Sequence, residues 1–137
     1  MDLFRQILSI DSTSGKEREL AIWIAEHFEA PRKDVFEVGD GSLDVLLSWG
    51  CRPEFVFCTH LDTVPPYIAP EFDGNTVRGR GSCDAKGQIF AMYRACRELE
   101  MRGYSNFALL LLSGEETGSW GAKYFAKTFF EAPYLII

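Results

Sequence analysis

The sequence lacks the features that mark secreted, membrane-spanning and nucleic-acid-binding proteins. Asp2 is acidic and charges interrupt the apolar residues that follow, which excludes a secretory signal in this segment. No later run is long and apolar enough to cross a bilayer, so we expect a cytoplasmic protein without a membrane partner. The 14 Lys and Arg are outnumbered by 20 Asp and Glu and form no basic run, so nucleic acid is not an expected partner.

Several catalytic classes are also missing their sequence signals. The four cysteines, at positions 51, 58, 83 and 96, form no C-x-x-C pair, and we expect them to be buried free thiols. The chain has no G-x-S-x-G, and Cys83 has no evident histidine partner, which argues against serine or cysteine hydrolysis. The segment GRGSCDAKGQ lacks the order of a phosphate-binding loop, and its acid, Asp84, would repel phosphate.

Apolar and β-rich runs alternate along the 137 residues, of which 47% are hydrophobic, as expected of one globular unit. The pattern predicts helices over 3–8, 14–28, 86–102 and 120–130, and strands over 33–38, 43–49, 54–59, 107–112 and 134–137, with a hairpin within 72–77. Ser14 and Glu17 have the spacing of a capping box. We therefore predict an α/β fold, with a mostly parallel or mixed sheet and helices on both faces.

Acidic and imidazole side chains stand where these apolar runs end or where a helix begins. His60 and Asp62 follow one strand, Asp84 precedes a helix, and Glu115 and Glu116 follow the strand FALLLL. Ligand-binding groups of open α/β sheets gather at such positions. An imidazole can bind a metal, a carboxylate can bridge two cations, and adjacent acids repel each other unless a cation or proton intervenes. The pattern favours a metal-dependent hydrolase.

Structural explanations remain open for each of these positions. Asp84 has the position of a helix N-cap, and the two glutamates could cap the helix that follows them. The His60 segment could be a loop histidine beside a solvated aspartate. The other histidine, His27, falls on or beside the apolar stripe of its helix, where we expect a packed or surface side chain.

Three segments in this order, THLDTVPP, GRGSCDAKGQ and SGEETGSWGA, resemble the zinc-dependent aminoacylase and carboxypeptidase family. That family includes acetylornithine deacetylase, succinyl-diaminopimelate desuccinylase and glutamate carboxypeptidase. The resemblance implies a three-layer α/β/α catalytic domain with two zinc ions, for which cobalt is a possible substitute. It implies that His60 binds one zinc and that Asp62 orients the His60 ring. It also implies that Asp84 bridges the two zinc ions, that Glu115 is the general base and that Glu116 binds the second zinc.

The resemblance also implies a substrate class and a missing part. It suggests hydrolysis of the amide of an N-acyl amino acid such as N-acetylornithine, an activity of arginine biosynthesis. The alternatives are a dipeptidase or carboxypeptidase on the same metals, or a non-catalytic metal-binding module. Residues 1–137 would be the N-terminal portion of the catalytic domain, inactive or nearly so alone, without the lid domain through which relatives dimerise.

Overall fold

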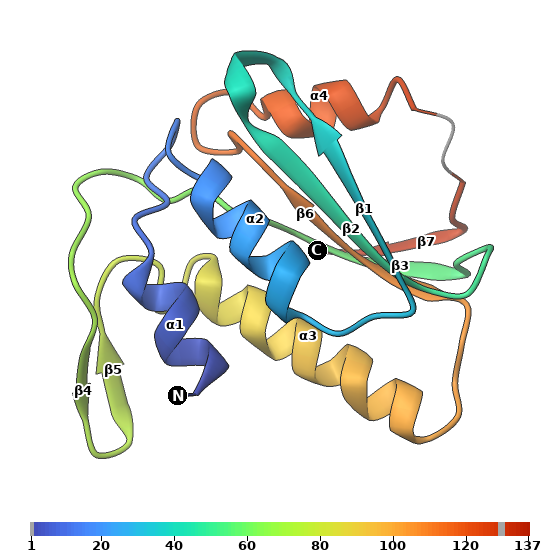
Figure 1. Cartoon of the computed structure of the whole chain (residues 1–137), viewed down its shortest axis with the longest axis horizontal. Coiled ribbons are helices and arrows are strands. Elements are labelled where there is room, and N and C mark those ends of the chain that lie inside the picture. The colour runs from blue at the N-terminus through green and yellow to red at the C-terminus, as the bar shows by residue number, and fades with distance from the viewer. Residues whose placement is uncertain (1, 129–130) are drawn as a thin grey trace.

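A five-stranded mixed sheet forms the centre of the protein in a computed structural model that describes residues 2–128 and 131–137 (Figure 1). The strand order is β1-β2-β6-β3-β7. Antiparallel pairing joins β1 to β2 and β2 to β6, whereas β3 runs parallel to both β6 and β7. The strands are β1 Arg32–Glu37, β2 Leu43–Trp49, β3 Phe55–His60, β6 Phe107–Leu112 and β7 Tyr134–Ile136.

Helices cover both faces of this sheet, which confirms the predicted fold class. Figure 1 shows α1, α2 and α3 on one face and α4 on the other. The helices are α1 Leu3–Ser9, α2 Arg18–His27, α3 Lys86–Met101 and α4 Trp120–Phe125. The strands β4 Glu71–Asp73 and β5 Thr76–Arg78 form a separate hairpin, and a short 3-10 helix spans Gly39–Gly41.

The strand side chains alternate between two apolar cores, because successive residues of a strand point to opposite faces. In β2, Val45 and Leu47 join the core beneath the three helices, which includes Ile24 and Ile89. Leu46 instead joins the smaller core under α4, where Phe125 packs. This alternation fixes which polar residues of β2 can face α4.

The observed elements begin and end close to the predicted residues, with two differences. The helix predicted over 120–130 ends at Phe125, and residues 129–130 lie outside the described part of the chain. The helix predicted over 14–28 begins at Arg18, and its predicted capping box does not form. The Ser14 hydroxyl donates to Asp62 (2.9 Å), and Glu17 accepts from the amide of Gly15 (2.6 Å). As a cap the Ser14 hydroxyl would accept from a helix amide. Here it donates instead to a buried carboxylate, and a hydrogen bond to a charged acceptor is stronger than one between neutral groups.

The expectation of buried cysteines is half right. All four are free thiols, but Cys51 and Cys83 are exposed. Burial raises the pKa of Cys58 to about 11 and that of Cys96 to about 12. Within residues 2–128 and 131–137, none of the helices has the length and apolar character to cross a membrane.

Candidate metal centre

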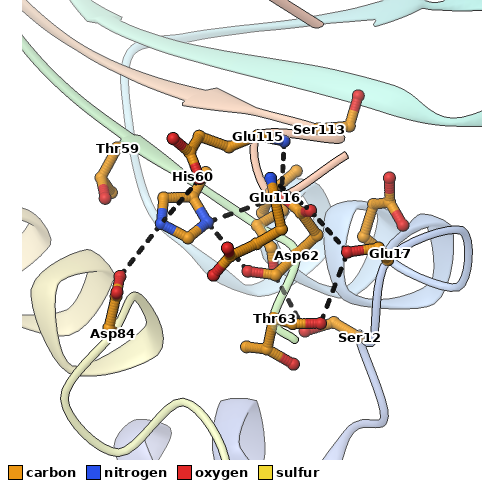
Figure 2. A network of polar contacts seen from close by, with 12 residues as sticks. Ser12, Glu17, Thr59, His60, Asp62, Thr63, Asp84, Ser113, Glu115 and Glu116 are labelled. Carbon is orange, nitrogen blue, oxygen red and sulfur yellow. Dashed lines mark hydrogen bonds and ion pairs between the residues drawn. The ribbon is translucent and has the colours of Figure 1, made fainter. Parts of the chain in front are cut away.

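The candidate site lies at the edge of the sheet where parallel strands β3 and β6 end. His60 is the last residue of β3 and pairs with Leu112, the last residue of β6. The turn that carries Glu115 and Glu116 follows directly, so it comes alongside His60. Asp84 reaches the same place from the loop that precedes α3 (Figure 2).

Three side chains from these separate segments converge. One ligand atom from each of His60, Asp84 and Glu116 lies within 4.8 Å of the other two. The Nε2 atom of His60 is 3.0 Å from Oδ1 of Asp84 and 4.0 Å from Oε2 of Glu115. The His60 ring is 13% exposed, whereas the side chains of Asp84 and Glu115 are 65% and 51% exposed. The cluster therefore has a protected imidazole and carboxylates open to solvent.

Asp62 is fully buried behind the cluster and holds the turn from within. Its carboxylate accepts hydrogen bonds from the amides of Glu115 (2.9 Å) and Glu116 (3.1 Å), and from the hydroxyl of Ser14 (2.9 Å). The Nδ1 atom of His60 lies 2.9 Å from the Asp62 carbonyl and 3.5 Å from its Oδ1. Asp62 thus contacts the imidazole and also fixes the backbone of both glutamates.

These contacts shift the charges of the site. Burial alone would lower the pKa of His60, but the hydrogen bonds and charge of Asp62 and the charge of Asp84 raise it to about 9. Burial alone would raise the pKa of Asp62, but hydrogen bonds from His60, Ser14 and the turn amides lower it. Partial desolvation raises the pKa of Glu116, an effect that His60 opposes. Without a metal, a proton on the imidazole compensates the surrounding carboxylates.

The structural alternatives for the acids are not what the fold shows. In the described chain Ala85, not Asp84, occupies the N-cap position of α3, and no capping side-chain hydrogen bond forms there. The peptide bond between Asp84 and Ala85 is cis. The N-cap position of α4 is taken by Ser119, so neither glutamate is at that position.

His27 lies outside the site, as expected. Its exposed ring stacks on Trp23 at 4.3 Å between ring centroids, and its Nδ1 atom is 2.8 Å from the Trp23 carbonyl.

A cleft of about 470 Å³ opens beside the cluster and could admit a small substrate. Its lining includes His60, Asp84 and Glu115, together with polar residues that sequence reasoning missed. Thr59 donates from its hydroxyl to the Gln88 side-chain oxygen (2.9 Å) at this lining. Thr59 directly precedes His60, and Gln88 lies four positions after Asp84, so their closeness to the motifs is the signal that could have found them.

The donor set fits a zinc ion. Zinc in proteins is bound by imidazole nitrogen and carboxylate oxygen, and a catalytic ion keeps a position open for water or substrate. Here one imidazole and two carboxylates converge, and the Nδ1 atom of His60 donates to the Asp62 carbonyl, which holds the imidazole ring in place. The described residues therefore contain a possible metal-binding group, with Glu115 beside it.

Known proteins with similar sequences and folds are hydrolases. A LysW-lysine/LysW-ornithine hydrolase of Sulfurisphaera tokodaii is 33% identical over 144 residues, covering 99% of this chain and 38% of that protein. A probable carboxypeptidase of Aspergillus terreus is 31% identical, over 93% of this chain and 34% of that protein. The chain thus spans little more than a third of the length of these relatives.

The fold also matches solved structures. An M20 family metallo-carboxypeptidase, Sso-CP2 from Sulfolobus solfataricus, superposes with a TM-score of 0.84 at 21% identity, over 99% of this chain and 37% of that one. The family model described as Peptidase family M20/M25/M40 matches residues 56–136, the segment that holds all five candidate site residues. Because this match covers more than half of the residues of the chain, the chain belongs to peptidase family M20/M25/M40.

Proposed function

We propose that this chain contributes most of a two-zinc centre that hydrolyses the amide bond of an N-acyl amino acid. The observation that carries the proposal is the convergence of His60, Asp84 and Glu116 with the carboxylate of Glu115 beside them. In the proposal His60 would hold one ion and Glu116 the second, and Asp84 would be shared between them. When bound, zinc would acidify water and polarise the substrate carbonyl.

The residues of the chain have distinct tasks in this proposal. Glu115 is half exposed and not engaged in a helix cap, so its carboxylate is available to take a proton from the attacking water. The same carboxyl group then protonates the departing amine nitrogen. Asp62 accepts a hydrogen bond from the amide of Glu115, which holds Glu115 in place beside His60.

Residues 1–137 are proposed to be the N-terminal portion of the catalytic domain. Two zinc ions need more protein donors than one imidazole and two carboxylates supply. The remaining ligands and the lid domain would then come from parts of the protein outside residues 1–137, in keeping with relatives that are nearly three times as long. A dimer formed through the lid stays a prediction, as does a cytoplasmic location.

The substrate proposal is an acetylornithine-like N-acyl amino acid. A relative named for hydrolysis of LysW-lysine and LysW-ornithine supports an amino-acid substrate. The second candidate is a carboxypeptidase or dipeptidase on the same site, supported by relatives named probable carboxypeptidases. A non-catalytic metal-binding module is the third and predicts zinc binding without turnover.

The test is an activity assay of the complete protein with zinc or cobalt, against N-acetylornithine, other N-acyl amino acids and dipeptides. The Glu115→Ala variant should lose at least about 100-fold in kcat, the usual contribution of a general base, while still binding zinc. Glu54→Ala, an acid at the opposite end of β3, is the matched control and should retain activity. Full activity of Glu115→Ala would refute the base assignment.

A further inference from the structure

A second buried acid, Asp44, contacts the turn of the candidate site from the opposite side to Asp62. It lies in β2, between the apolar neighbours Leu43 and Val45, and its side chain is fully buried. Its Oδ1 atom accepts two hydrogen bonds from Ser113, one from the amide (2.8 Å) and one from the hydroxyl (2.9 Å). Ser113 begins the turn that leads to Glu115.

The start of α4 closes over this contact. The Gly121 amide donates to the Ser113 carbonyl (3.0 Å), so Ser113 is held through its amide, hydroxyl and carbonyl. A Cβ atom on Gly121 would lie 2.4 Å from Oδ1 of Asp44 and 2.6 Å from the Ser113 carbonyl oxygen. Only glycine lets α4 approach so closely, which shows how tightly the carboxylate is enclosed.

The site turn is therefore held at both ends by buried carboxylates. Asp44 fixes Ser113 at its start, and Asp62 fixes the amides of Glu115 and Glu116 at its end. A buried carboxylate in an apolar strand costs stability unless its hydrogen bonds compensate for the lost water. In the described chain the second oxygen of Asp44 has no hydrogen-bond partner, so packing alone does not explain an acid here.

We propose that Asp44 is a positioning residue of the metal centre, which sets the direction of the glutamate-bearing turn by binding Ser113. It touches neither the cluster nor the cleft and acts through the backbone. This role rests on the proposed function of the turn, but the contact itself can be tested without metal. Burial raises the pKa of Asp44 against the effect of the Ser113 hydrogen bonds, so a neutral side chain is compatible with the role.

The test compares Asp44→Ala with Asp44→Asn by amide hydrogen exchange in the zinc-free protein. Asparagine keeps an acceptor oxygen for Ser113, whereas alanine removes it. We expect Asp44→Ala to speed exchange of the Glu115 and Glu116 amides roughly tenfold, since the turn loses one of its two anchors. Asp44→Asn should stay within about twofold of the unmodified protein, which would show rescue by the acceptor.

Val45→Ala is the matched control for a purely structural effect. Val45 is the next residue of β2, fully buried in the opposite core, and does not face Ser113. Its truncation should lower stability and speed exchange across the sheet without a selective effect at the turn. The proposal would be overturned if Asp44→Ala left exchange at Glu115 and Glu116 unchanged, or if it sped exchange across the whole sheet as Val45→Ala does. It would also be overturned if Asp44→Asn failed to restore protection.

Zinc affinity, measured by competition with a chromophoric chelator, separates this proposal from the one on which it rests. We expect Asp44→Ala to weaken zinc binding about tenfold and Asp44→Asn to leave it unchanged. If the complete protein without substitutions binds no zinc, the metal centre is refuted, and the exchange rates still decide whether Asp44 positions the turn.

Discussion

At the scale of single residues, His60 is the group whose charge responds most to the state of the site. Asp62 lies against one ring nitrogen and Asp84 against the other, and together they favour the protonated ring. A metal on the ring would replace that proton. Proton and metal therefore compete for His60, which makes the metal-free protein sensitive to pH.

We predict that the zinc-free protein loses stability between pH 6.5 and 9. The folded pKa of His60, about 9, lies above its ordinary value of 6.5, so its contribution is fully present below pH 6.5 and is lost as pH rises through 9. The loss should be on the order of 3 kcal/mol at most, at about 1.4 kcal/mol per pKa unit. Urea unfolding with a chelator present would measure it.

His60→Gln should lack this pH dependence, since glutamine does not titrate. His27→Gln, which replaces an exposed histidine outside the site, should keep it. The same slope in the His60 variant as in the unmodified protein would contradict the assignment.

At the scale of elements, α4 and β2 approach each other closely at Gly121. We predict that Gly121→Ala destabilises the protein by about 1–3 kcal/mol, the usual cost of overpacking, because the new methyl group meets Asp44 and Ser113. Alanine otherwise favours a helix, so a loss of stability would identify the steric contact.

Gly39→Ala is the control for that substitution, because a Cβ atom there meets no other atom within 4 Å. Its free energy of unfolding should change by no more than about 0.5 kcal/mol. Thermal or urea denaturation of both variants checks the pair. Equal effects of the two substitutions would argue against the close contact at Gly121.

The elements themselves could be predicted from sequence because their signals are local. The run FALLLL is β6, and the Asp-Gly step after Val38 lies in the turn that joins β1 to β2. The contacts that build the site are not local. Its spacing predicts that Ser14 caps its own helix, but Ser14 donates to Asp62, 48 positions away.

The five site residues could be proposed from sequence because acidic and imidazole side chains are conspicuous where a strand ends or a helix begins. Asp44 was missed because it stands at neither kind of position. The signal was present, since an acid inside the apolar run LDVLLSW calls for a partner. That partner, Ser113, is identified only once β2 and β6 are seen to pair.

At the scale of the whole molecule, metal binding and folding should be coupled, because the ligands come from three separate segments. Zinc at about 100 times its Kd should raise the free energy of unfolding by roughly 2.7 kcal/mol, and a chelator should reverse the effect. Asp84→Ala should remove most of this stabilisation, since it deletes one of the three converging ligands.

Asp73→Ala removes an exposed acid of the separate β4–β5 hairpin and should leave the zinc effect intact. Thermal unfolding with and without zinc would compare the two variants. An equal zinc effect in both would place the ion away from Asp84.

The anchors of the glutamate turn have a consequence for biosynthesis. Ser113 meets Asp44 across 69 positions of the chain, and Glu115 meets Asp62 across 53. Contacts so distant in sequence form only after long loops have closed. As the chain emerges from the ribosome, both aspartates therefore appear well before the amides that pair with them, and the turn of the candidate metal centre can form only after Glu116 has emerged.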